Sequence, residues 1–123
     1  MAKRILVVED TAHLRENILE LLSMEGYSVS SAQHGREGLS LLQESMPDLI
    51  ITDLRMPEMD GFDFIARVRE NKLWNGIPIL VFSAMPPHEN EKIILRLGAN
   101  AYLKKPSALE DLVTAVKKLI DDE

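Results

Sequence analysis

The sequence predicts an α/β fold in which a five-stranded parallel sheet, with strand order 2-1-3-4-5, carries helices on both faces. Two observations predict this doubly wound sandwich. Short, continuously apolar runs alternate with longer segments in which apolar residues recur every three or four positions. These are the patterns of buried parallel strands and amphipathic helices. Five strand–helix units follow one another, and right-handed crossovers then place helices on both faces of the sheet.

Three of the predicted strands are central and two lie at the edges. The central strands are the continuous apolar runs 5–8, 49–51 and 79–82, because a strand buried on both faces has no polar side. The edge strands are 27–31, which alternates polar and apolar residues, and the short run 101–103. With these two at the edges, the strand order 2-1-3-4-5 follows.

Apolar spacing predicts five helices between and after these strands. They are centred on residues 14–22, 39–42, 64–68, 93–97 and 109–120. Gly26 and Gly98 follow the first and fourth segments, where glycine commonly ends a helix. Ser107 and Glu110 have the spacing of a capping box before the last helix.

Composition limits the classes of function. The chain has 123 residues, which fits one domain over 1–123 with no output domain. A net charge of -6 argues against direct binding to nucleic acid or an anionic membrane. The absence of cysteine excludes disulfides and thiolate metal sites. No apolar run is long enough to cross a bilayer, so we expect a cytoplasmic protein.

We expect His34 at the surface and Trp74 in a loop, partly covered.

Polar residues follow each predicted central strand at its carboxyl end. Glu9 and Asp10 follow the first strand and Asp53 follows the third. Ser83 ends the fourth strand, and the fifth strand ends in Lys104-Lys105. Ligands of open α/β sheets bind beyond the carboxyl ends of the strands, where the strand order reverses. We therefore expect the three acids to converge on one rim of the sheet, with Ser83 and one of the two lysines arriving from the side.

This set of side chains is suited to phosphoryl transfer. Three neighbouring carboxylates repel one another, and Mg²⁺, which prefers oxygen ligands, relieves that repulsion. A carboxylate nucleophile with Mg²⁺, a hydroxyl and a lysine can position and neutralise a phosphoryl group, giving an aspartyl phosphate. Taken alone, Asp10 could be a helix cap, Ser83 a turn residue and Lys105 a surface charge. Their joint position at strand ends favours the site.

Four stretches stand in order along the chain: Ile5–Asp10, the sequence DLRMPEMDG at Asp53–Gly61, Ser83-Ala84 and Lys105-Pro106. These four stretches carry a resemblance, over the whole chain, to the receiver domains of two-component response regulators. The resemblance implies that Asp53 is the phosphoacceptor and that Ser83 and Lys105 contact the phosphoryl group. It also implies a cis Lys105-Pro106 bond. The implied Mg²⁺ ligands are Glu9, Asp10, Asp53 and the backbone carbonyl of Arg55.

The resemblance also implies a conformational switch. Ser83 would move toward the phosphoryl group and Tyr102 would turn inward. This would change a surface made by the fourth helix, the fifth strand and the fifth helix, which a partner reads. Pro86 and Pro87 could restrict the loop after Ser83, or Pro87 could simply begin the fourth helix.

The resulting hypothesis is a single-domain response regulator rather than an ordinary enzyme. It would take its phosphoryl group from a sensor histidine kinase or a histidine phosphotransfer protein. It would also dephosphorylate itself, with Arg55 and Met85 beside the path of the attacking water. Output would pass through a downstream protein, with the chain as a monomer or a phosphorylation-linked dimer.

Three other functions are weighed against this one. An Mg²⁺-dependent phosphohydrolase usually has a second acid two residues after its nucleophile, where this chain has Arg55. A flavodoxin-like cofactor binder needs a phosphate loop after the first strand, where Glu9 and Asp10 place negative charge. A receiver fold used only for interaction would not need the complete set of acids, hydroxyl and lysine.

Overall fold

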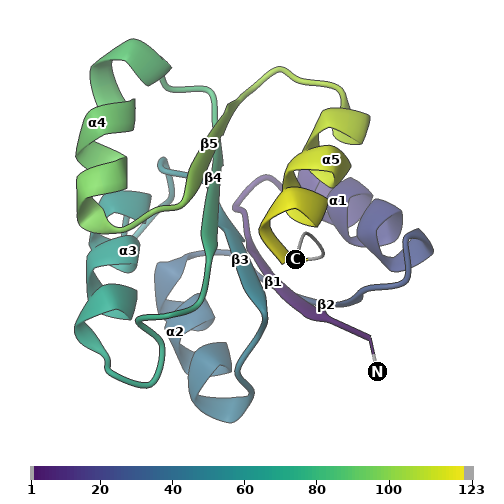
Figure 1. Cartoon of the computed structure of the whole chain (residues 1–123), viewed down its shortest axis with the longest axis horizontal. Coiled ribbons are helices and arrows are strands. Elements are labelled where there is room, and N and C mark those ends of the chain that lie inside the picture. Colours follow the sequence, from purple (N-terminus) through teal and green to yellow (C-terminus); the bar gives the residue numbers. More distant parts are fainter. Residues whose placement is uncertain (1, 121–123) are drawn as a thin grey trace.

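The chain forms a central sheet with helices on both sides (Figure 1). The computed structural model describes residues 2–120, apart from the side chain of Glu89. The strands are β1 (Arg4–Val8), β2 (Ser28–Ala32), β3 (Leu49–Thr52), β4 (Ile79–Ser83) and β5 (Ala101–Lys104). The helices are α1 (Ala12–Met24), α2 (Gly35–Glu44), α3 (Gly61–Glu70), α4 (Pro87–Leu97) and α5 (Leu109–Ile120). All strand pairs are parallel and the order is β2-β1-β3-β4-β5, so the predicted topology is confirmed.

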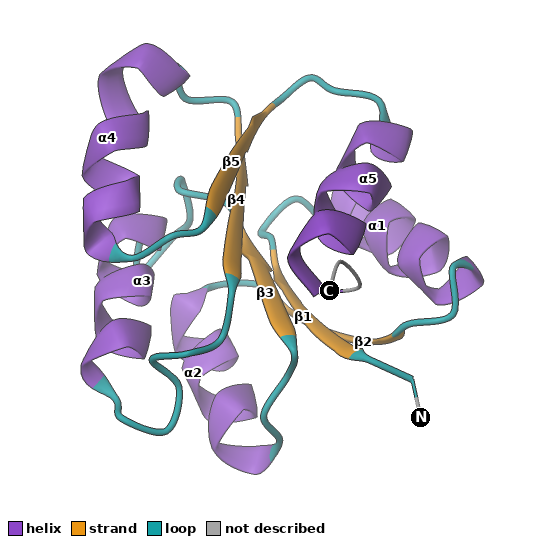
Figure 2. Ribbon diagram, in the orientation of Figure 1, coloured by secondary structure: helices purple, strands orange, loops and turns teal. Residues whose placement is uncertain are grey.

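The sheet separates two hydrophobic cores, because successive side chains of a strand point to opposite faces. Leu6 and Val8 of β1 pack with α2, α3 and α4 on one face. Ile5 and Val7 of the same strand pack with α1 and α5 on the other face. Figure 2 shows the same division, with α2, α3 and α4 on one side of the strands and α1 and α5 on the other.

Burial distinguishes the central strands from the edges as predicted. Every residue of β3 and β4 is buried, because both faces of these strands are covered by helices. Exposed and half-buried residues alternate along most of β2, and β5 has no fully buried residue. The polar alternation at 27–31 and the shortness of 101–103 therefore reflect real sheet edges.

Two local predictions are wrong. Ser107 does not cap α5 within the described residues; its hydroxyl donates to the carbonyl of Lys104, and the helix begins at Leu109. Trp74 lies in the turn between α3 and β4 as predicted, but it is buried rather than partly covered: it is 8% exposed and belongs to the core beneath α2, α3 and α4. The simpler interpretation of Pro87 holds, because α4 begins at this residue. No helix within residues 2–120 has the length and apolar character needed to cross a membrane.

Candidate functional site

Backbone hydrogen bonds continue one residue beyond the strands and hold the predicted site residues at the carboxyl edge of the sheet. The Glu9 amide donates to the carbonyl of Ala32 at 3.0 Å. The Asp53 amide donates to the carbonyl of Val8 at 3.2 Å. The Lys105 amide donates to the carbonyl of Ser83 at 2.8 Å. The positions of these side chains therefore follow from the register of the sheet.

Lys105 joins two of the acids. Its Nζ lies 2.8 Å from Oδ2 of Asp53 and 2.8 Å from Oε1 of Glu9. The second Asp53 oxygen, Oδ1, accepts a hydrogen bond from the Leu54 amide at 2.6 Å. Asp53 and Glu9 are 8% and 2% exposed, respectively. The structure thus places an ammonium group against two largely desolvated carboxylates.

This arrangement changes the proton affinities of the paired groups. Burial raises the pKa of Glu9, and the nearby Lys105 ammonium only partly opposes that effect. Burial also acts to lower the pKa of Lys105, but hydrogen bonds to Asp53 and Glu9 outweigh it and raise the pKa above its usual value. Lys105 is therefore charged at neutral pH and can neutralise an anionic group bound at Asp53.

The acids also form a donor set that fits a divalent cation. Glu9, Asp10 and Asp53 each offer a carboxylate oxygen, and these oxygens lie within 4.8 Å of one another. Asp10 is exposed whereas the other two are buried, so the cluster opens to solvent on one side. With Lys105 counted, two formal negative charges are left over. A hard dication with oxygen ligands fits both that charge and that chemistry.

The other predicted site residues, Ser83 and Arg55, lie at or just beyond the ends of β4 and β3, but within residues 2–120 their side chains make no hydrogen bond to the Asp53 carboxylate. Ser83 is completely buried, and its Oγ accepts a hydrogen bond from the Met85 amide at 3.2 Å. Within residues 2–120, no hydrogen bond joins Ser83 to the Asp53 carboxylate. The amide of Arg55 lies 3.4 Å from Oδ1 of Asp53. The Arg55 side chain is exposed.

Tyr102 and Ser83 meet at the same short segment. The Tyr102 hydroxyl donates to the carbonyl of Met85 at 2.5 Å, while Ser83 accepts from the amide of Met85. Burial raises the pKa of Tyr102, so its hydroxyl remains a proton donor at neutral pH. The backbone of Met85 therefore connects the predicted hydroxyl donor to the predicted switch aromatic.

Two supporting contacts could not be predicted from the sequence. The Thr11 amide donates to Oε2 of Glu9 at 3.1 Å. The Arg15 guanidinium donates to the backbone carbonyl of Glu9 at 2.8 Å. The only sequence signal for Arg15 is a cation in the first half of α1, close to the acidic pair. These contacts orient Glu9 toward Lys105.

Gly61 allows the loop after Asp53 to close. The Gly61 amide donates to the carbonyl of Leu54 at 2.8 Å. A Cβ at this glycine would lie 2.3 Å from the Asp53 carbonyl oxygen and 2.7 Å from Cα of Leu54. Any larger residue would therefore displace backbone that carries the acid. The Lys105-Pro106 bond is cis, as the resemblance implied.

Comparison with known proteins identifies close structural and sequence similarity. The pattern of the response regulator receiver domain family matches residues 5–117. Response regulator MprA of Mycolicibacterium vanbaalenii is 39% identical over 120 residues, which are 98% of this chain and 51% of MprA. The chain thus spans about half the length of that curated relative. An uncharacterised 14.6 kDa protein of Leptolyngbya boryana is 39% identical over 93% of this chain and 87% of its own length.

Solved structures agree with these sequence matches. The chemotaxis protein CheY4 of Vibrio cholerae has a TM-score of 0.92 and 31% identity, over 97% of this chain and 99% of that one. The receiver domain of the sensor histidine kinase PA1611 from Pseudomonas aeruginosa has a TM-score of 0.88 and 25% identity, over 98% and 99% of the two chains. That receiver domain was solved with a magnesium ion in its active site cleft.

Proposed function

The chain belongs to the receiver domain family of two-component response regulators, and on that basis we propose that Asp53 accepts a phosphoryl group in a Mg²⁺-dependent reaction. The observation that carries this proposal is the pairing of buried Asp53 with the Lys105 ammonium at 2.8 Å, beside an acidic cluster open to solvent. A carboxylate held next to a cation is equipped to receive a phosphoryl group and to stabilise its charge.

The proposed transfer uses residues that already lie at the edge of the sheet. An oxygen of the Asp53 carboxylate attacks the phosphorus of a phosphohistidine on the donor protein. An O–P bond forms as the donor's N–P bond breaks, and the imidazole nitrogen keeps that electron pair. The Leu54 amide orients Asp53, Lys105 moves onto a phosphoryl oxygen, and the Ser83 hydroxyl donates to another.

The proposed cation site uses oxygen donors of the same loops. Its ligands are Glu9, Asp10, Asp53 and the backbone carbonyl of Arg55. Mg²⁺ bound there supplies positive charge beside the phosphoryl oxygens. The magnesium ion in the PA1611 receiver domain supports this assignment by analogy.

Self-dephosphorylation is proposed at the same site. A water molecule attacks the phosphorus, the bond to the Asp53 oxygen breaks, and inorganic phosphate leaves. Arg55 and Met85 lie at the two loops that border Asp53 and Ser83, so they flank the proposed path of this water. The protein is in this sense a phosphoacceptor switch with two activities toward its own aspartate.

We propose that α4, β5 and α5 form the face that responds to phosphorylation. Ser83 and Tyr102 both contact the backbone of Met85, so a shift of Ser83 toward the phosphoryl group would be transmitted to Tyr102. On α4, Ile93 and Leu95 are 51% and 43% exposed. These exposed apolar side chains support the docking of a partner protein on this face.

The proposed phosphoryl donor is a sensor histidine kinase or a histidine phosphotransfer protein, and the proposed output is binding to a downstream protein. Association as a phosphorylation-linked dimer and a cytoplasmic location stay predictions. The phosphohydrolase hypothesis gains no support, because Arg55 rather than an acid stands two residues after Asp53. The flavin hypothesis gains none either, because Glu9 and Asp10 occupy the loop after β1.

The test is the intact mass of the chain after incubation with acetyl phosphate, with and without Mg²⁺, sampled from seconds to minutes. We expect a gain of one phosphoryl group that requires Mg²⁺ and that Asp53→Ala abolishes. Asp63→Ala is the matched control, because Asp63 is exposed on α3, and it should label like the wild type. Mg²⁺-dependent labelling that persists in Asp53→Ala would refute the assignment, and a wild type that gains no mass would contradict the phosphoacceptor role.

A further inference from the structure

An aromatic ring lies beneath the ammonium group of Lys105. The Nζ atom of Lys105 is 5.4 Å from the centroid of the Phe82 ring, over its face. Phe82 is 3% exposed and packs in the core beneath α1 and α5. An ammonium within about 6 Å of a ring centroid is attracted by the ring quadrupole, and the attraction increases when the pair is desolvated.

The sheet register explains why these two residues meet. Phe82 of β4 pairs with Leu103 of β5. Lys105 follows Leu103 by two residues, and its amide continues the ladder to Ser83. Because side chains alternate across a strand, Leu103 and Lys105 lie on the same face as Phe82, whereas Lys104 lies on the other. The contact is therefore set by the backbone and is specific to Lys105.

We propose that Phe82 is a positioning residue for Lys105 in the phosphoryl-transfer reaction, a role that rests on the proposed function of Asp53. The ammonium has three N–H donors, and the carboxylates of Asp53 and Glu9 each accept a hydrogen bond from it. The Phe82 ring attracts the same ammonium without requiring an N–H in a particular direction. It keeps the nitrogen beside Asp53 while the donors rotate from the carboxylates to a phosphoryl oxygen.

This role differs from that of an ordinary core phenylalanine. A residue that only fills volume is sensitive to size and shape, whereas a cation–π partner is sensitive to the electron density of its ring. Fluorine atoms on the ring withdraw that density with little change in volume. Phe64 is the matched control, because it is completely buried on the opposite face of the sheet and makes no cation–π contact among the described residues.

The experiment places mono-, di- and trifluorophenylalanine at position 82, and in a parallel series at position 64, in the whole chain. The rate of Asp53 labelling by acetyl phosphate is measured at saturating Mg²⁺, and thermal unfolding confirms that each protein is folded. We expect the rate to fall stepwise along the Phe82 series, by about fivefold at trifluorophenylalanine. The Phe64 series should leave the rate unchanged.

A second measurement tests the contact itself. The methylene protons next to Nζ of Lys105 should show an upfield ring-current shift in the NMR spectrum of the wild type, and Phe82→Leu should remove it. If the protein is labelled but the labelling rate is the same along the Phe82 series, or falls equally along both series, the positioning role alone is overturned. Absence of the upfield shift would overturn it as well. A wild type that never labels would overturn the proposed function and this inference together.

Discussion

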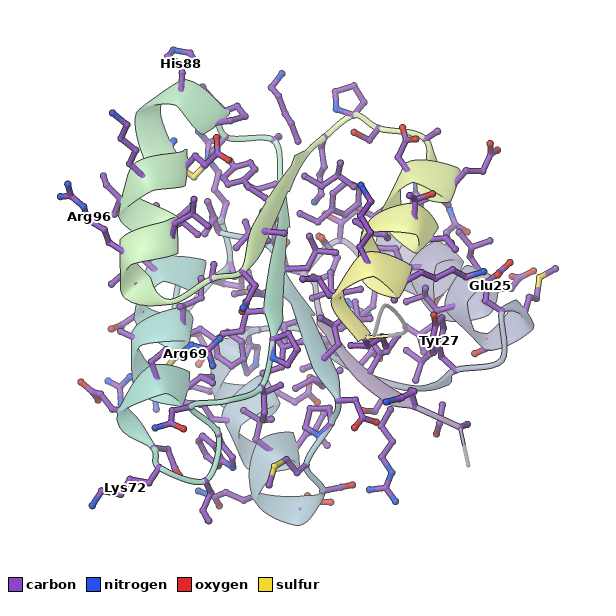
Figure 3. All side chains as sticks on the ribbon, viewed as in Figure 1. Glu25, Tyr27, Arg69, Lys72, His88 and Arg96 are labelled. Carbon is purple, nitrogen blue, oxygen red and sulfur yellow. The ribbon has the colours of Figure 1, made fainter. Side chains whose placement is uncertain are left out.

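Arg69 joins three segments at the end of the sheet opposite Asp53, and Arg69→Ala is predicted to weaken that end. In Figure 3 its side chain projects from α3 toward the strands. Its Nε donates to the carbonyl of Gly98 at 2.9 Å, and Nη2 donates to Oδ1 of Asn100 at 3.1 Å. Nη1 donates to the carbonyls of Trp74 and Asn75 at 3.3 and 3.1 Å. One guanidinium thus connects α3 to the segments that enter β4 and β5.

The expected loss of stability can be worked from these bonds. The bonds to Gly98 and Trp74 are partly buried, and each contributes about 1–1.5 kcal/mol. The bonds to Asn75 and Asn100 are exposed and add little, because water replaces them when they are lost. We therefore expect Arg69→Ala to lower the free energy of unfolding by about 2–3 kcal/mol.

Arg67→Ala is the matched control on the same helix. Arg67 is 55% exposed, and among the described residues its side chain has one ion pair, with Asp63 at 4.0 Å, so its loss should cost less than about 0.5 kcal/mol. The assay is urea unfolding at 25 °C of the wild type, Arg69→Ala and Arg67→Ala. The dependence of the free energy of unfolding on urea concentration should be equal for the three proteins. Asp53 labelling should be normal in both variants. If Arg69→Ala destabilised the protein no more than Arg67→Ala, the hydrogen-bond reasoning would be refuted.

Three further predictions concern the site. Gly61→Ala should lower the free energy of unfolding by more than about 2 kcal/mol and slow labelling, because its Cβ would lie 2.3 Å from the Asp53 carbonyl oxygen; unchanged stability would contradict this. Asp10→Asn should keep the fold but weaken Mg²⁺ binding by about tenfold or more in calorimetric titration, since it removes an exposed charged ligand. Glu9→Gln should flatten the pH dependence of stability in metal-free buffer. Burial raises the pKa of Glu9 above its ordinary value, so the folded state binds this proton more tightly than the unfolded state does. The stability that Glu9 contributes is therefore present at low pH and is lost as the pH rises through the raised pKa. Identical profiles of stability against pH for the wild type and Glu9→Gln would contradict this.

The central strands of the sheet are predictable because a strand buried on both faces appears in the sequence as a continuous apolar run. The apolar runs 49–51 and 79–82 correspond to β3 and β4, but each strand extends one polar residue further, to Thr52 and Ser83. Likewise β1 begins at Arg4, whose backbone pairs with Ser28 although its side chain is exposed. Strand pairing is a property of the backbone, and side-chain hydrophobicity cannot show where it stops.

Contacts between segments far apart in the chain are less predictable. His34 lies at the surface as expected, with its side chain 26% exposed, and its Nδ1 accepts from the Glu37 amide and caps α2. Its Nε2 lies 3.3 Å from Oε2 of Glu58 in the loop after β3. Trp74 is buried because α2 and α3 cover it, although its sequence neighbours are polar. The contact of His34 with Glu58 and the burial of Trp74 both depend on tertiary structure, which the local sequence pattern does not show.

In the candidate site, too, the positions of the residues are predictable but their side-chain contacts are not. Strand ends predict that Glu9, Asp53 and Lys105 lie together, since the carboxyl ends of parallel strands share one edge. The pattern does not reveal that Lys105 pairs with both acids at 2.8 Å, nor that Phe82 lies beneath its ammonium. Those contacts depend on side-chain rotamers that only the packed structure defines.

β5 is held by several hydrogen bonds at its amino end but holds the loop after β4 by fewer, and this difference suits a switch. At its amino end, Asn100 donates its amide to Ile79 and accepts through Oδ1 from Arg69 and from the Ile79 amide. Tyr102, the second residue of β5, holds the loop after β4 through one hydrogen bond from its hydroxyl to the carbonyl of Met85. A displacement of the loop after β4 therefore has to break only one bond at Tyr102, whereas the amino end resists movement through several. The change proposed to follow phosphorylation of Asp53 would then be confined to the Tyr102 side chain, the loop after β4 and the start of α4.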